Sequence, residues 1–117
     1  AGIGLRDLTG IYIDKGSSMA YIADMEFEWD EAKSDACFKE RGFDFAYVLK
    51  AFFDPERFVR KDHRWDYGED RFQLMGTVED RLFVVIYTVR KSAVRIISAR
   101  KANSREVAQY ENSARES

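Results

Sequence analysis

Cysteine, proline and histidine are almost absent from this sequence, since each occurs once in 117 residues, as Cys37, Pro55 and His63. A single cysteine excludes an internal disulfide and is typical of a reducing compartment. No second cysteine or histidine stands near to complete a zinc site, and the carboxylate spacing matches no calcium-binding motif. We therefore expect no metal ligands here, and a small buried thiol at Cys37.

Long apolar runs are also missing, so no segment has the length of a membrane span, and the N-terminus lacks the layout of a signal peptide. The sequence has no glycine-rich phosphate loop, no nucleophile elbow and no dinucleotide fingerprint. These absences predict a soluble cytoplasmic protein that uses no cofactor.

Hydrophobic residues make up 45% of the chain and aromatic residues 15%, which is typical of one globular domain. The net charge is only −2, but the charges are unevenly spread. Residues 24–35 hold six acids and one lysine, whereas residues 90–105 hold six lysines or arginines and no acid. This asymmetry favours a local anion site over uniform basicity.

Residues 1–24 differ from the rest because glycine and serine interrupt any sustained period. We interpret them as a peripheral N-terminal extension, from a tag or upstream sequence, that precedes a domain at residues 25–117, with Met25 as a natural start. The alternative is a genuine strand added at a sheet edge, for which residues 10–14 are the candidate.

The periodicity of residues 25–117 predicts helices and strands in blocks. Asp30 is expected to cap a helix that stops at Gly42, and a second helix runs from Asp44 to residues 54–55. Strands are predicted at residues 25–29, 58–59, 71–78, 82–89 and 94–99, with the run at 82–89 covered on both faces. Asn103 and Glu106 have the spacing of a capping box that starts a last helix. The predicted fold class is α+β, an antiparallel meander with two N-terminal helices and a C-terminal helix.

The densest polar stretch is the loop at residues 62–71, between two predicted strands. Its carboxylates, phenol and guanidiniums suffice for proton transfer beside an anion clamp. The alternative is a solvated loop in which Arg64 and Arg71 pair with Asp66 and Glu69.

RNA cleavage is one reaction that needs neither metal nor cofactor. The 2′-hydroxyl is an internal nucleophile, so a protein need only align it, move protons and neutralise developing charge. Trp65, Tyr67 and Tyr87 are candidates for stacking on exposed bases, with core packing as the alternative, which weighs equally for Tyr87.

Three stretches resemble BrnT, the toxin of BrnT/BrnA type II toxin–antitoxin systems. They are FEWDEAK at residues 27–33, DYGEDRF at 66–72 and RIISARKA at 95–102, followed by Glu106 and residues 110–111. The resemblance covers residues 25–111 in the correct order and leaves out residues 1–24.

The resemblance implies a RelE/ParE-like ribonuclease fold and growth arrest by RNA cleavage. It also implies a BrnA-like antitoxin that neutralises the toxin in a hetero-oligomer and carries it, indirectly, to operator DNA. From the resemblance, the cationic strand and the polar loop we expect catalytic roles for Arg64, Tyr67, Glu69, Arg95 and Arg100, and RNA-binding roles for Arg71, Ser98 and Lys101. Tyr87 is added to the RNA-binding residues as a candidate for base stacking.

The sequence departs from the family pattern after the first helix. Relatives often show Asn-x-x-Lys-His-Gly, whereas Cys37 and Arg41 replace the asparagine and the histidine here. An alternative function is therefore a catalytically degenerate toxin that only binds its antitoxin and acts as a co-repressor of the operon.

Strict alternation in the last strand divides its cations between two faces. It places Arg95 and Lys101 on one face and Ser98 and Arg100 on the other. The arginines can then meet one phosphate only if the strand bends or ends near Arg100, and they must converge with the loop at residues 64–71.

Overall fold

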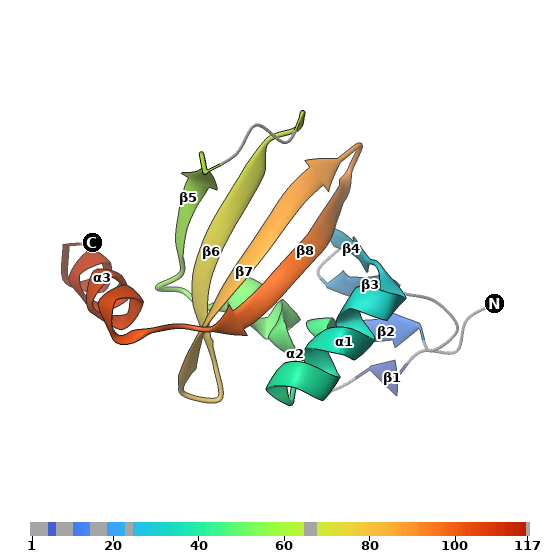
Figure 1. Cartoon of the computed structure of the whole chain (residues 1–117), viewed down its shortest axis with the longest axis horizontal. Coiled ribbons are helices and arrows are strands. Elements are labelled where there is room, and N and C mark those ends of the chain that lie inside the picture. The colour runs from blue at the N-terminus through green and yellow to red at the C-terminus, as the bar shows by residue number, and fades with distance from the viewer. Residues whose placement is uncertain (1–4, 7–10, 15–18, 23–24, 65–67, 117) are drawn as a thin grey trace.

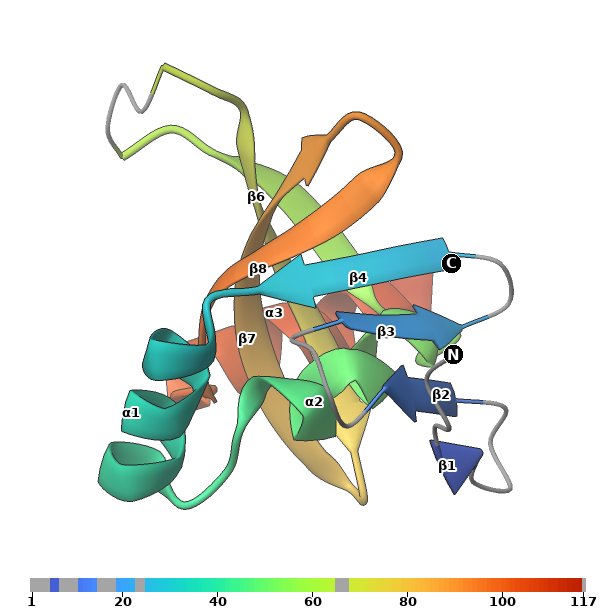
Figure 2. The same cartoon turned by 90° about the vertical axis from the view of Figure 1, so that its right-hand side faces the viewer.

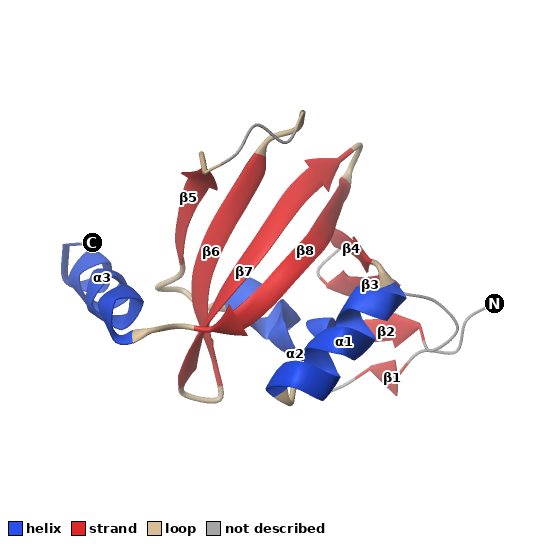
Figure 3. Ribbon diagram, in the orientation of Figure 1, coloured by secondary structure: helices blue, strands red, loops and turns tan. Residues whose placement is uncertain are grey.

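The computed structural model describes residues 5–6, 11–14, 19–22, 25–64 and 68–116 (Figure 1). Its centre is an eight-stranded sheet with the order β1-β2-β3-β4-β8-β7-β6-β5. Helices α1 and α2 lie on one side of this sheet and α3 lies on the other (Figure 2). Figure 3 shows the same arrangement as a layer of strands between helices.

The helices begin where the capping residues predict. α1 (Glu31–Arg41) starts at Asp30, whose side chain accepts a hydrogen bond from the Lys33 amide at 3.1 Å. It stops at Gly42, where φ is 87°, a left-handed conformation that glycine adopts without a steric penalty. Asp44 caps α2 (Phe45–Val48), which continues as a 3₁₀ turn, η1 (Leu49–Phe53), so the predicted second helix is split.

The strands β5 (Phe58–Asp62), β6 (Arg71–Val78), β7 (Arg81–Arg90) and β8 (Ala93–Lys101) form the predicted antiparallel meander. β5 extends through residues that the sequence assigns to a loop. β4 (Met25–Trp29) pairs with β8 in parallel, with Glu28 opposite Arg95. The α+β fold class is therefore confirmed, while this one parallel pairing makes the whole sheet mixed.

Three short strands precede β4. β3 (Met19–Ile22) pairs antiparallel with β4, and β2 (Ile11–Asp14) and β1 (Leu5–Arg6) follow outward. Their backbones thus continue the sheet beyond β4. The division of the chain at residue 24, and the origin of the preceding segment, stay predictions.

Two apolar cores lie on opposite faces of the meander. The larger core packs α1, α2 and η1 against the sheet and includes Phe27, Leu49, Leu74, Val85 and Ile96. The smaller core joins Met75, Leu82, Val84 and Ile86 to Val107 and Tyr110 of α3. β7 contributes to both cores, which explains its uninterrupted apolar run. The prediction that this strand is covered on both faces is confirmed.

The C-terminal helix α3 (Ser104–Glu116) is anchored at its middle by Tyr110. The hydroxyl of Tyr110 donates to Asp54 Oδ2 at 2.5 Å, and the same oxygen accepts from the Thr77 amide and hydroxyl at 2.9 and 3.0 Å. Burial and this carboxylate raise the pKa of Tyr110 to about 12. The phenol therefore remains protonated and acts as a donor that fixes α3 to the sheet.

β6 and η1 approach closely at Gly76. A Cβ atom on Gly76 would lie 2.3 Å from the carbonyl oxygen of Ala51, so only glycine fits this position.

Among the helices described, the longest has 13 residues, and none is long and apolar enough to cross a membrane.

Candidate functional site

One face of the meander carries a set of polar and cationic side chains, and we call it the arginine face. Register pairing aligns them in two adjacent rows across β5, β6, β7 and β8. The first row is Arg60, Gln73, Ile86 and Ser98, and the second is Asp62, Arg71, Thr88 and Arg95. Arg100 follows on the same face, opposite Val84. The smaller core under α3 lies on this face too, so the arginines border its apolar floor.

A register shift in β8 decides which cations share this face. Ser98 pairs with Ile86 and Ile96 pairs with Tyr87, so Ile97 has no partner on β7. One additional residue in a strand reverses the alternation beyond it. Arg95 and Arg100 therefore lie on one face, and the placement on opposite faces that strict alternation predicts is wrong.

Arg64 returns to the arginine face after the end of β5. Its Nε and Nη2 donate to the two oxygens of Asp62 at 2.9 and 3.0 Å. The side chain of Asp62 is only 4% exposed, whereas that of Arg64 is 61% exposed, so a buried carboxylate holds an accessible guanidinium. The predicted partner Asp66 and the predicted catalytic Tyr67 lie outside the described residues.

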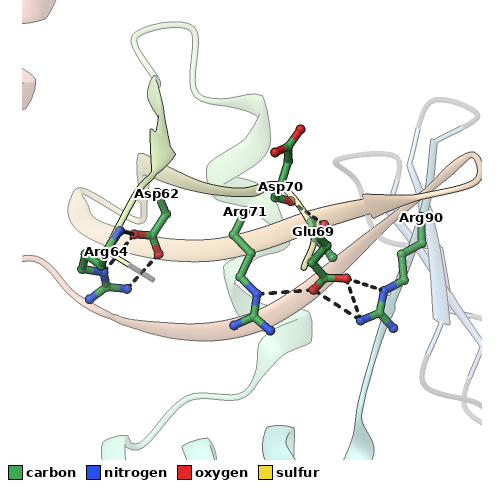
Figure 4. A network of polar contacts seen from close by, with 7 residues as sticks. Asp62, Arg64, Glu69, Asp70, Arg71 and Arg90 are labelled. Carbon is green, nitrogen blue, oxygen red and sulfur yellow. Dashed lines mark hydrogen bonds and ion pairs between the residues drawn. The ribbon is translucent and has the colours of Figure 1, made fainter. Parts of the chain in front are cut away.

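Arg64 and Arg100 converge closely enough to influence each other. Hydrogen bonds to Glu106 raise the pKa of Arg100, and the positive charge of Arg64 opposes this shift. The guanidinium groups of Arg64, Arg71 and Arg90 also point to the same side of the sheet (Figure 4). Arg64, after β5, is thus near enough to the end of β8 to act on Arg100, whereas the convergence of Arg95 with the loop stays a prediction.

Glu69 lies between two arginines (Figure 4). It accepts from Arg71 Nε at 3.3 Å and from Arg90 Nη2 at 3.1 Å. Desolvation favours the neutral carboxyl, but the hydrogen bonds and charges of Arg90 and Arg71 outweigh it and lower the pKa of Glu69. Glu69 is therefore ionised at neutral pH, and the pairing of Arg71 with Glu69 agrees with the alternative interpretation of this loop.

Arg100 is held by the start of α3. Its two terminal nitrogens donate to the two oxygens of Glu106 at 2.7 Å each. Glu106 also accepts from the Asn103 amide at 2.9 Å, while Asn103 Oδ1 accepts from the Glu106 amide at 2.9 Å. The predicted capping box is confirmed, and it joins the helix terminus to the arginine face.

Two of the predicted RNA-binding residues lie on the opposite face. Tyr87 packs against the rings of Phe52 and Phe72, with centroids at 5.2 and 5.4 Å. Lys101 pairs with Phe83 at the end of β8 and is exposed on the side of α1 and α2. The arginine face therefore carries Arg71, Arg95, Ser98 and Arg100, and Arg64 and Glu69 form ion pairs with residues of this face, whereas Tyr87 and Lys101 lie on the other side.

Comparison with known families gives a match. The family described as "Ribonuclease toxin, BrnT, of type II toxin-antitoxin system" matches residues 29–106 of the 117-residue chain. The chain belongs to the BrnT toxin family. No curated protein matches the chain. Membership implies that this BrnT-family protein has an antitoxin as its partner.

Sequence reasoning assigned no role to two arginines and a glutamine that belong to the same face. Arg60 donates to Gln73 Oε1 at 2.6 Å, and Gln73 is buried. Arg90 belongs to the cation-rich segment at 90–105 but was assigned no role. The alternate positions of Phe58, Arg60 and Asp62 are the signal in the sequence that β5 contributes side chains to the arginine face.

This BrnT-family protein thus presents a fixed array of guanidiniums with an apolar floor and an ionised carboxylate. Guanidiniums remain charged at all physiological pH values and bind phosphate oxygens in pairs. Such an array can bind a phosphodiester and stabilise additional negative charge on it. Within the described residues, no group of three or more histidine, cysteine, aspartate or glutamate side chains gathers at one point.

Proposed function

We propose that this BrnT-family protein is an endoribonuclease that cleaves RNA by attack of the substrate's own 2′-hydroxyl, without a metal ion. The observation that carries the proposal is the gathering of arginines from β5, β6, β8 and the loop after β5 on one face. Attack by the 2′-hydroxyl creates a phosphorane with more negative charge than the phosphodiester. Arginines that are already in place stabilise this charge without reorganisation.

The roles follow from position. Arg95 and Arg100 flank Ser98 along β8 on the arginine face, and together with Arg64 they are proposed to hold the scissile phosphate. The ion pairs with Asp62 and Glu106 fix two of these guanidiniums in orientation before RNA binds. Each pair leaves part of the guanidinium exposed, because the side chains of Arg64 and Arg100 are 61% and 41% exposed.

Proton transfer is assigned to the loop that carries Glu69. At neutral pH Glu69 is a carboxylate, the form that accepts a proton from a 2′-hydroxyl, although its two arginine partners lower its basicity. Tyr67 is the other candidate. Arg71 both orients Glu69 and faces the RNA, whereas Tyr87 is assigned to the core.

Purified protein is expected to cleave RNA in buffer that contains EDTA. Arg64→Ala should lower kcat/KM by roughly 100- to 1,000-fold, the usual effect of removing one oriented donor to a developing oxyanion. Arg115→Ala removes an exposed arginine near the end of α3 and should leave the rate unchanged. RNA that remains intact with wild-type protein, with and without ribosomes, would contradict the proposal.

We further propose that the partner is a BrnA-like antitoxin that covers the arginine face with an acidic segment, and that it carries the complex to operator DNA. Expression of the toxin alone should then arrest growth, and coexpression of the antitoxin should relieve the arrest. Loss of the arrest in Arg64→Ala would connect toxicity to the same site.

A binding module without catalysis remains the competing function. The engagement of Glu69 in two ion pairs favours it, because these pairs lower the basicity of the proposed proton acceptor. Tight complex formation with the antitoxin, combined with intact RNA and unaffected cells, is the outcome that identifies it.

A further inference from the structure

A cavity lies on the face opposite the arginine face. It has a volume of about 590 Å³ and is enclosed by the C-terminal end of α1, by α2 and by the β6–β7 turn. The β6–β7 turn and the C-terminal end of α1 lie in the lower part of Figure 1, on either side of the end of β8. The volume falls within the range of about 300–1,000 Å³ that is typical of ligand sites.

The floor of this cavity is aromatic. Phe83 contacts Phe43 and Tyr47, with ring centroids at 4.9 and 5.9 Å. Tyr47 is fixed because its hydroxyl donates to Glu79 Oε2 at 2.7 Å. At the rim, Phe38 of α1 is 58% exposed, which leaves a large apolar ring in water beside a cavity. Exposed rings of this kind stack on unpaired bases.

Cations surround the aromatic floor. Arg41, Arg81 and Lys101 line the cavity from α1, β7 and β8. The two carboxylates that also line it, Asp44 and Glu79, accept hydrogen bonds from the backbone and side chain of Tyr47. The lining thus has three cations and two carboxylates, and both carboxylates already accept hydrogen bonds from Tyr47. This excess of positive charge favours an anionic ligand.

The cavity is continuous with the arginine face. A second cavity of about 300 Å³ is lined by Arg41, Phe43, Arg100 and Lys101. Three of these residues also line the larger cavity, and the fourth, Arg100, belongs to the arginine face. The end of β8 therefore joins the two, since Arg100 points to one side of the sheet and Lys101 to the other.

We propose that the larger cavity is a nucleotide subsite that holds an unpaired base and its phosphate, on the same RNA strand whose scissile phosphate lies on the arginine face. The proposal rests on the proposed ribonuclease function and extends it from cleavage to substrate selection. Phe38 stacks on the base, and Arg41, Arg81 and Lys101 contact the backbone. RNA is favoured over an antitoxin segment because the cavity continues from the face that is proposed to bind the phosphodiester.

The test uses Phe38→Ala and Arg81→Ala, both at exposed positions. For a single-stranded RNA of about ten nucleotides, Phe38→Ala should raise KM roughly 5- to 100-fold, as expected for one lost stacking contact, with kcat unchanged. Arg81→Ala should raise KM less and make binding less dependent on salt, because one phosphate contact is lost. Lys39→Ala, an exposed lysine of α1 outside the cavity, is the matched control.

Ser98 and Lys101 are separated along β8 by roughly 10 Å at the usual rise of a strand, and the cavity lies beyond Lys101, so a dinucleotide bound at Ser98 is expected not to reach Phe38. Cleavage of the dinucleotide should therefore be the same in wild-type protein, Phe38→Ala and Arg81→Ala. Equal KM values for the long RNA in all variants, or equal losses on both substrates, would overturn the proposal.

A second measurement separates this proposal from the ribonuclease function. Fluorescence anisotropy with a 2′-O-methyl RNA of the same length reports binding without cleavage, so it decides the subsite even if the protein cleaves nothing. If Phe38→Ala binds this RNA as tightly as wild-type protein but binds the antitoxin more weakly, the cavity is an antitoxin site and the proposal is wrong.

Discussion

Glu106→Gln removes the negative charge that joins α3 to Arg100 of the arginine face. Glutamine preserves the shape of the side chain and still completes a capping box with Asn103, but it cannot form a bidentate ion pair with Arg100. Asn103→Ala is the complementary change, because it removes the side-chain half of the capping box and retains the ion pair. The two variants therefore separate the contribution of the charge from that of the cap.

The magnitude follows from the geometry of the pair. Two hydrogen bonds at 2.7 Å join ionised groups, and the side chain of Glu106 is only 8% exposed. A hydrogen bond to a charged group contributes about 1.5–3 kcal/mol. Because Arg100 is 41% exposed, solvent screens the pair, and we expect a total loss of about 2 kcal/mol. Asn103→Ala should cost about 1 kcal/mol, as is typical of a lost cap.

Urea denaturation at several pH values is the assay. Hydrogen bonds from Arg100 are the main cause that lowers the pKa of Glu106 below its usual value of 4.5. The ionised carboxylate therefore stabilises the fold above pH 4.5, and this stabilisation is lost as the pH falls through the lowered pKa. The difference between wild-type protein and Glu106→Gln should be full at neutral pH and small in acid. An equal difference at both pH values would refute the ion-pair account.

Three other perturbations follow from single contacts. Gly76→Ala should destabilise the fold by about 3 kcal/mol in thermal unfolding, because the new methyl group would overlap the carbonyl of Ala51; an unchanged Tm would mean that β6 and η1 can separate. Tyr110→Phe should cost about 1–2 kcal/mol in urea unfolding, since Asp54 loses one of its donors, and a stability equal to wild type would show that α3 docks by apolar contact alone. Cys37 is 3% exposed, and burial raises the pKa of its thiol. A thiol reagent at neutral pH should therefore modify Cys37 in the folded protein at least about 100-fold more slowly than in the protein unfolded by urea. Equal rates would contradict the burial of Cys37.

Local signals predicted much of the fold. Asp30, Gly42 and Asn103 marked helix ends correctly because each acts through its own side chain or its own φ angle. The strands at 71–78 and 82–89 were found because their apolar pattern is long. The parallel pairing of β4 with β8 was missed, since it joins segments more than 60 residues apart and depends on packing that no local pattern records.

The candidate site was predictable in composition but not in geometry. Arg64, Arg95 and Arg100 were selected from their cationic segments and from the BrnT resemblance. Their common face depends on the register shift at Ile97, which strict alternation does not contain. Arg60 was missed because the polar residues that follow it resemble a loop, although β5 extends through them.

The parallel pairing of β4 with β8 has a consequence for synthesis of the chain. β8 inserts between β4 and β7, so the two parts of the sheet stay separate until residues near 100 have left the ribosome. The ion pair between Arg95 Nη1 and Glu28 Oε1, at 3.6 Å, forms only after this insertion. Contacts between such distant segments form late because of the entropy of closing the loop. A partly synthesised chain therefore has no complete arginine face, and the proposed ribonuclease site forms only when β8 is in place.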